Sequence, residues 1–115
     1  MRKFLQGFRF AGQGIAAGLR GQINIKVMLF LAAVAVVLSL VLKISLLEWA
    51  LIVGVIGLVL SLELLNTAGE KVVDILSPHH DPRYGQVKDI LAGAVLIASL
   101  AAAVVGALVF IPKWL

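Results

Sequence analysis

The sequence predicts an all-α membrane protein with an N-terminal amphipathic surface helix and three transmembrane helices. Two observations predict this fold class. The 115 residues are 62% hydrophobic and only 14% charged, whereas about a quarter of the residues of an average soluble domain are charged. Three long runs also lack any charged side chain. A chain of this length forms one domain, residues 1–115, and it has more apolar surface than one small globule can bury.

The three uncharged runs predict the transmembrane helices. They are Val27–Leu42, Trp49–Leu62 and Ile90–Pro112. A helix needs about 20 apolar residues to cross a bilayer, which the third run supplies and the first reaches if Lys26 and Lys43 snorkel from its ends. The second run is too short unless the span continues through Glu63 and Asn66. We therefore expect spans over about 25–43, 46–76 and 86–112.

Residues 4–22 predict a helix that lies in the membrane interface. Large apolar side chains recur there at helical spacing, with basic side chains between them. The apolar positions are Phe4, Leu5, Phe8, Ile15 and Leu19. After the second span, Pro78 and Pro82 break the chain, so we expect a loop and then a new helix from about Gln86.

Lysine and arginine residues indicate the orientation. Eight flank one side of the predicted spans: Arg2, Lys3, Arg9, Arg20, Lys26, Lys71, Arg83 and Lys88. Only Lys43 and Lys113 flank the other side. The positive-inside rule puts the N-terminus and residues 71–88 in the cytoplasm, and the C-terminus outside. The net charge of +4 then reflects basic residues at the cytoplasmic edge of the membrane, where they meet anionic headgroups. We therefore expect no nucleic-acid partner. The absence of cysteine excludes disulfides and thiolate metal sites.

Four polar residues share one face at the end of the second span, in the stretch "LELLNTAGEKVVD". At about 100° per residue, Glu63, Asn66, Glu70 and Asp74 lie within about 80° of arc, on a stripe about 16 Å long. One interpretation is a solvated helix end whose carboxylates pair with lysine and arginine, such as Lys71, Lys88 and Arg83. The other is a site for a divalent cation and phosphate, because Mg²⁺ prefers one or two carboxylates together with phosphate oxygens.

Other motifs are less specific. Lys88 and Asp89 either begin the third span as an interfacial lysine and a first-turn acid, or lie where Lys88 neutralises a phosphate. His79, His80 and Asp81 either bind a metal or form a polar loop. No phosphate-binding P-loop motif occurs. Small residues four apart in the third span predict close helix packing: Ala94, Ala98, Ala102 and Gly106.

Two motifs together resemble a known family. "ELLNTAGEKVVD" is followed fourteen residues later by "KDILAGAVL", and "FRFAGQGI" lies near the N-terminus. The sequence resembles the prokaryotic diacylglycerol kinases, which are small integral-membrane lipid kinases, and most closely the branch that phosphorylates undecaprenol in Gram-positive bacteria. The resemblance covers nearly the whole chain. It implies a homotrimer in the bacterial plasma membrane, with cytoplasmic active sites at subunit boundaries.

The resemblance also implies a reaction and residue roles. The reaction is ATP- and Mg²⁺-dependent phosphorylation of a lipid primary alcohol, undecaprenol first and diacylglycerol as the alternative. Glu63 would be the general base and Asn66 would position the hydroxyl, with Arg9 also contacting the lipid. Glu70 and Gln22 would hold Mg²⁺. The remaining nucleotide contacts would be His79, His80, Asp81, Lys88 and Asp89, with Asp74 supporting this end of the site.

Three positions depart from the family pattern: Gln22 replaces a metal-binding glutamate, Gly69 a bulky apolar residue and Asp81 a histidine. Two other functions remain open, a small channel or proton relay and a non-catalytic assembly subunit. The pairing of the polar stripe with Lys88 and Asp89 favours the kinase. A conduction path needs polar groups across the bilayer, and the first and third spans offer only Ser39 and Ser99 at depth.

Overall fold

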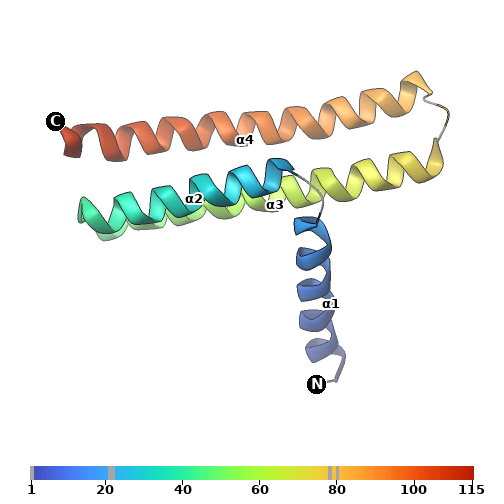
Figure 1. Cartoon of the computed structure of the whole chain (residues 1–115), viewed down its shortest axis with the longest axis horizontal. Coiled ribbons are helices and arrows are strands. Elements are labelled where there is room, and N and C mark those ends of the chain that lie inside the picture. The colour runs from blue at the N-terminus through green and yellow to red at the C-terminus, as the bar shows by residue number, and fades with distance from the viewer. Residues whose placement is uncertain (1, 21–22, 78, 80) are drawn as a thin grey trace.

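A computed structural model describes residues 2–20, 23–77, 79 and 81–115. Within these residues the chain forms four helices: α1 (Arg2–Leu19), α2 (Ile23–Val41), α3 (Leu46–Leu76) and α4 (Pro82–Trp114). Figure 1 shows α2, α3 and α4 lying alongside one another, with α3 antiparallel to the other two, and α1 running transverse to them. Three helices are long and apolar enough to cross a membrane, which confirms the predicted all-α class.

The two ends of the bundle differ. We call the end where residues 77–81 connect α3 to α4 the loop end, and the opposite one the far end. At the far end, Ser45 and Glu48 form a capping box at the start of α3, in which the Glu48 side chain accepts from the Ser45 amide and the Ser45 side chain accepts from the Glu48 amide. Glu48 also pairs with Lys113 of α4, with Oε1 and Nζ 2.9 Å apart. The ends of α3 and α4 are therefore tied together there.

A cluster of buried apolar residues lies in this far half of the bundle. Ile44, Ile52 and Val109 are buried and contact one another. Half-buried side chains of α2, α3 and α4 pack around them, including Trp49 and Phe110. Full burial of an aliphatic side chain stabilises a fold by about 1.5–3 kcal/mol in water, but lipid replaces water here, so close packing contributes more than transfer from solvent.

The start of α4 differs from the prediction. The helix begins at Pro82, and not near Gln86, because Asp81 caps it. The Asp81 side chain accepts a hydrogen bond from the Arg83 amide, and proline suits the first helical position since its missing N–H would have no partner there. The helices α1 and α2 begin and end two or three residues before the predicted limits of 4–22 and 25–43, and Gln22 lies outside the described residues.

Helix α1 meets α3 part-way along its length. Gly18 of α1 is buried and lies against Leu64, so closely that a Cβ on Gly18 would overlap the leucine side chain. At 1.5 Å per residue, α3 rises about 27 Å from Leu46 to Leu64, close to the roughly 30 Å thickness of a bilayer's hydrocarbon core. The residues of α3 after Leu64, with the first turns of α4, extend beyond α1. We call this part the extension.

A second close approach joins α3 to α4 within the extension. A Cβ on Gly69 would overlap Leu91 Cδ1 and come within 3.4 Å of Cδ2. The family pattern has a bulky apolar residue at position 69. Here Leu91 occupies that space from the opposite helix, so a larger residue at position 69 would have to displace the leucine side chain.

We expect Gly69→Val to lower the stability of the protein by about 1–3 kcal/mol, because overpacking forces side chains or backbone to move. The thermal unfolding midpoint in one detergent measures the effect. Leu91→Ala in the same chain should recover part of the loss, since it vacates the space. A double variant no more stable than Gly69→Val alone would mean that the two positions do not share this space.

Candidate active site

The predicted polar stripe of α3 is buried at its first two residues, Glu63 and Asn66, and so is Thr67 beside it. Glu63, Thr67 and Asn66 are 2%, 3% and 7% exposed. The Thr67 hydroxyl donates to the backbone carbonyl of Glu63 at 3.0 Å, which fixes its rotamer, and Asn66 Nδ2 donates to Glu70 Oε1 at 3.4 Å. Four polar side chains of one helix are thus held together within two turns.

Two oxygens in this cluster have no hydrogen-bond partner among the described residues. They are Glu63 Oε1 and Asn66 Oδ1, and both are inaccessible to solvent. Leaving a buried acceptor unsatisfied costs about 1–3 kcal/mol, and more when the group is charged. Such atoms are rare in native proteins. The two belong to neighbouring turns of the same face, so α3 presents two buried acceptor atoms side by side.

The outer part of the stripe meets α4. Lys88 Nζ forms an ion pair with Asp74 Oδ1, and the two side chains are 34% and 65% exposed. The interpretation in which lysine neutralises the carboxylates is therefore correct for Asp74. It is wrong for Arg83, which pairs with Asp81 instead. The stripe thus has a buried part at Glu63 and Asn66 and a solvated, paired part at Asp74.

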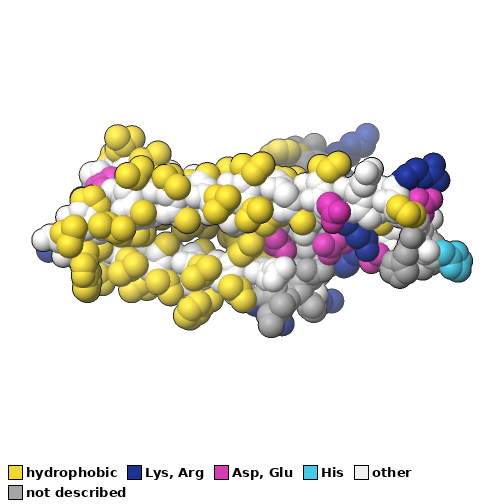
Figure 2. Space-filling model, turned by 90° about the horizontal axis from the view of Figure 1, so that it is seen from above, with side chains coloured by type: hydrophobic (Ala, Val, Ile, Leu, Met, Phe, Trp, Pro, Cys, Tyr) yellow, Lys and Arg dark blue, Asp and Glu magenta, His cyan; other side chains and the backbone are white. Residues whose placement is uncertain are grey.

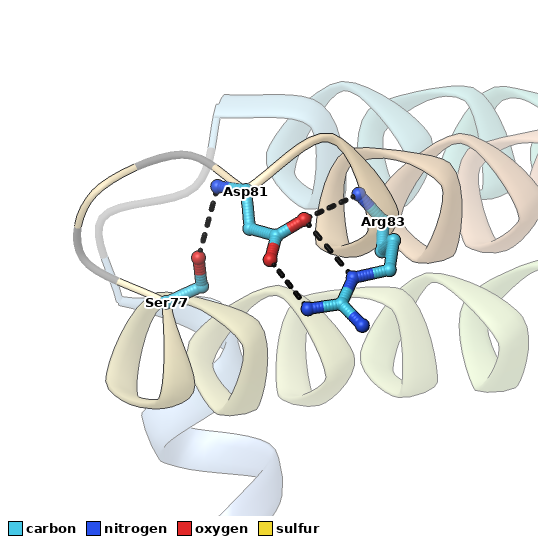
Figure 3. A network of polar contacts seen from close by, with 3 residues as sticks. All are labelled: Ser77, Asp81 and Arg83. Carbon is cyan, nitrogen blue, oxygen red and sulfur yellow. Dashed lines mark hydrogen bonds and ion pairs between the residues drawn. The ribbon is translucent and has the colours of Figure 1, made fainter.

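The tip of the hairpin carries a separate polar network, drawn in Figure 3. Asp81 Oδ1 accepts from the Arg83 amide at 2.9 Å, and Oδ2 accepts from the guanidinium at 2.9 Å. The Ser77 hydroxyl accepts from the Asp81 amide at 3.1 Å. The Arg83 guanidinium holds the pKa of Asp81 below its usual range, so this carboxyl stays ionised. These residues border a hollow of about 620 Å³, together with His79 and Tyr84.

Several predicted site residues lie apart from the buried cluster. Arg9 is exposed on α1, which points away from the bundle in Figure 1. Asp89 is exposed near the start of α4, and His79 is exposed at the tip. Gln22 and His80 lie outside the described residues. Within the described part of the chain, no three His, Asp or Glu side chains are grouped as metal ligands. The single carboxylate of Glu70 suits Mg²⁺, which takes one or two protein carboxylates with phosphate oxygens.

An apolar groove of about 380 Å³ lies between α2, α3 and α4. Ile52, Ile56 and Leu60 of α3 line it. At about 100° per residue these three positions fall within about 60° of Glu63, so the groove and the polar stripe occupy the same face of α3. Figure 2 shows apolar side chains over most of this view and most charged side chains gathered toward the end that carries histidine. One face of one helix therefore passes from apolar groove to buried carboxylate.

The sequence analysis did not predict the groove, although the spacing of its α3 residues was visible in the sequence. Ile52, Ile56 and Leu60 continue the spacing of Glu63, Thr67, Glu70 and Asp74 toward the far end. In an apolar span every face is apolar, so spacing alone did not distinguish a groove from a lipid-facing surface. The groove depends on how far α2 and α4 stand apart, which only the structure gives.

Comparisons with known proteins decide the family. The profile described as "Prokaryotic diacylglycerol kinase" matches residues 9–110. The chain belongs to this family. This lipid kinase is thus a phosphotransferase and a multi-pass membrane protein, and membership implies that it uses ATP. The predicted resemblance is confirmed.

Two curated relatives match nearly the whole kinase. It is 34% identical over 113 residues to "Undecaprenol kinase" of Bacillus subtilis, an alignment that covers 98% of this chain and 92% of the relative. It is 33% identical over 112 residues to "Diacylglycerol kinase" of Synechocystis sp., covering 96% of this chain and 64% of that relative. A comparison with solved structures gave no match.

Proposed function

We propose that this kinase transfers the γ-phosphate of ATP to a membrane lipid alcohol, with undecaprenol as the preferred substrate and diacylglycerol as the alternative. One observation carries the proposal: the Glu63 carboxylate, whose buried Oε1 has no hydrogen-bond partner among the described residues, lies on the same face of α3 as the apolar groove. A lipid whose tail occupies the groove brings its hydroxyl to Glu63. The similarity to the undecaprenol kinase supports the choice of lipid, because it covers more of the relative than the similarity to the diacylglycerol kinase does.

Glu63 acts as the general base in this mechanism. Its Oε1 accepts a hydrogen bond from the lipid hydroxyl and then takes its proton. The hydroxyl oxygen attacks the γ-phosphorus, the bond from phosphorus to the bridging oxygen breaks, and ADP leaves with the electron pair. Asn66 helps to hold the hydroxyl by donating the second N–H of Nδ2 to its oxygen, since the first is donated to Glu70, and Arg9 contacts the lipid from α1. Phosphoryl transfer depends mostly on positioning and charge neutralisation, which a few polar groups supply.

The nucleotide binds on the extension. Lys88 exchanges Asp74 for a phosphate oxygen, and Asp74 keeps the ammonium group in place when no nucleotide is bound. Glu70 would hold Mg²⁺, with Gln22 as a further oxygen ligand, and the ion when bound neutralises phosphate charge. Asp89 contributes at the start of α4. His79, His80 and Asp81 cover the nucleotide from the hairpin tip, where Arg83 and Tyr84 line the hollow.

We further propose that the loop end and the N-terminus face the cytoplasm and that the far end lies outside, in a bacterial plasma membrane. The eight basic residues on the loop-end side support this orientation. In the proposed assembly, three copies of this single domain form a homotrimer.

The purified kinase should form ADP only when a lipid alcohol is present, and kcat/KM should be higher for undecaprenol than for diacylglycerol. We would measure ADP release with each lipid in micelles of one detergent, with a reaction lacking lipid as the control. Equal or reversed preference would assign diacylglycerol as the main substrate. ADP release that does not depend on any lipid alcohol would contradict the proposed function itself.

A further inference from the structure

The polar groups around the hollow at the hairpin tip already have partners or reach water. The Ser77 hydroxyl accepts from the Asp81 amide, and both Asp81 carboxylate oxygens accept from Arg83 (Figure 3). The Arg83 side chain is 86% exposed, so its other N–H groups meet solvent. Among the described residues, the buried side-chain atoms that lack a partner belong to Glu63 and Asn66. The described lining of the hollow therefore contains no buried polar atom that needs a particular ligand atom.

The hollow continues the polar stripe of α3 and the Lys88 face of α4. Ser77 follows Asp74 by three positions, and Tyr84 lies one helical turn before Lys88. From Glu63 to Ser77 the chain rises about 21 Å. In the proposed function the phosphates of the nucleotide lie between Glu63 and Lys88. The nucleoside, which is the other end of the same molecule, then reaches the tip.

We propose that the hollow binds the nucleoside end of the phosphoryl donor without selecting its base, so that the kinase uses GTP about as well as ATP. The inference rests on the proposed function, because it assumes that the nucleotide binds on the extension. A site rejects the wrong substrate strongly when buried polar groups are left unpaired by it. The described lining of the hollow has no such group, so adenine and guanine meet the same surroundings there.

The side chains at the hollow suit contacts that every base can make. The ring of Tyr84 and the planar guanidinium of Arg83 both line it. Aromatic rings stack on any base because each base has a π face, and arginine adds a cation–π contribution. These contacts give affinity for the nucleoside without reading the polar edge of its base.

Asp81 is a positioning residue in this arrangement. Its two oxygens hold the Arg83 guanidinium through Nε and Nη2, at 3.3 and 2.9 Å. An exposed arginine otherwise moves among many rotamers, and ordering it on binding costs free energy. Asp81 replaces a histidine of the family pattern. It therefore serves the nucleotide through Arg83 and not by direct contact.

The first test compares the two purine nucleotides as phosphoryl donors. Formation of lipid phosphate by the purified kinase is measured over a range of ATP and of GTP, at saturating lipid and Mg²⁺. We expect the two values of kcat/KM to lie within about tenfold of each other, whereas sites that hydrogen-bond their substrate specifically reject analogues by about 10⁴–10⁵. A preference for ATP of more than about tenfold would overturn the inference.

The second test compares Arg83→Gln with Lys71→Gln. Lys71 is exposed on the same extension and does not line the hollow, so its substitution removes the same charge elsewhere. Arg83→Gln should raise KM about tenfold for both nucleotides, the order of effect of losing one stacking contact. It should leave kcat unchanged, because a contact far from the reacting phosphate acts equally in the ground and transition states. Lys71→Gln should change neither value. Equal effects of the two variants, or an effect of Arg83→Gln on one nucleotide only, would contradict the proposal.

The third test combines Asp81→Asn with Arg83→Gln. Asparagine still caps α4 but cannot form the ion pair, so the single variant should fold and have a raised KM. In the Arg83→Gln background Asp81→Asn should add no further loss, since there is no guanidinium left to position. A further loss would show that Asp81 meets the nucleotide itself, which overturns its positioning role.

Failure of this inference is distinguishable from failure of the proposed function. Lipid phosphate formed from ATP but not from GTP overturns only the inference. Absence of lipid phosphate with either nucleotide overturns the proposed function.

Discussion

Glu63→Gln should lower kcat by about 10²–10⁴ and leave ATP binding nearly unchanged. The range is that expected when a general base is lost. Glutamine has nearly the shape of glutamate, so the packing around this 2%-exposed side chain should persist. The amide cannot accept the hydroxyl proton. ATP affinity should change little because Glu63 lies about 16 Å along α3 from Asp74, where Lys88 binds.

The matched control is Glu48→Gln, which makes the same chemical change at the far end of the same helix. Glu48 pairs with Lys113, so its loss should lower stability and not the turnover of the folded protein. Rates of both variants should be measured with saturating ATP and lipid, alongside nucleotide binding and the unfolding midpoint. A Glu63→Gln protein with near-normal kcat would remove this residue from the chemistry.

Glu70→Gln should nearly abolish activity at ordinary Mg²⁺ concentrations. Glu70 is the half-buried carboxylate between Glu63 and the paired Asp74, and it accepts a hydrogen bond from Asn66. Changes even in residues behind the direct metal ligands cost 10- to 100-fold in metal affinity in other proteins. We therefore expect the Mg²⁺ concentration for half-maximal rate to rise at least about tenfold.

A Mg²⁺ titration of the rate, at fixed ATP and lipid, measures this change, and a direct Mg²⁺ binding measurement in the presence of ADP provides a readout independent of turnover. Asp74→Asn is the informative comparison. It should strengthen ATP binding, because Lys88 no longer has to break its ion pair with Asp74 to reach a phosphate oxygen, while leaving the Mg²⁺ requirement close to that of the wild type. If the two variants have the same Mg²⁺ dependence, Glu70 has no special relation to the ion.

The sequence was sufficient to predict the transmembrane helices because a helix needs about 20 apolar residues to cross a bilayer, and the chain has three long runs without charge. It was also sufficient for the polar face, since Glu63, Asn66 and Glu70 follow helical spacing over two turns. The start of α4 was missed, although the pair Asp81–Pro82 is a common cap and first residue. The prediction treated Pro82 as a residue that ends a helix, whereas here it is the first residue of one.

Other features depend on contacts between helices and have no local signal. Which oxygens of Glu63 and Asn66 lack a partner among the described residues depends on what other helices place beside them. The reason for Gly69 is found in Leu91, twenty-two positions away. Helical spacing predicts which residues share a face, but the distance between neighbouring helices decides whether that face is packed, open or occupied by a ligand.

The contact between Gly18 and Leu64 holds the surface helix α1 at a fixed distance from the far end of α3. The length of α3 between these points therefore fits one bilayer thickness. Helix α3 is nearly inextensible, so the distance from its far-end capping box to Glu63 is constant at about 26 Å. A bilayer of matching thickness puts the carboxylate at the boundary where a lipid hydroxyl and an aqueous nucleotide meet. A thicker bilayer would draw it into hydrocarbon and a thinner one would lift it into water, at a modest cost per ångström of mismatch. In the proposed mechanism, lipid composition would then change the catalytic rate by moving Glu63 relative to this boundary.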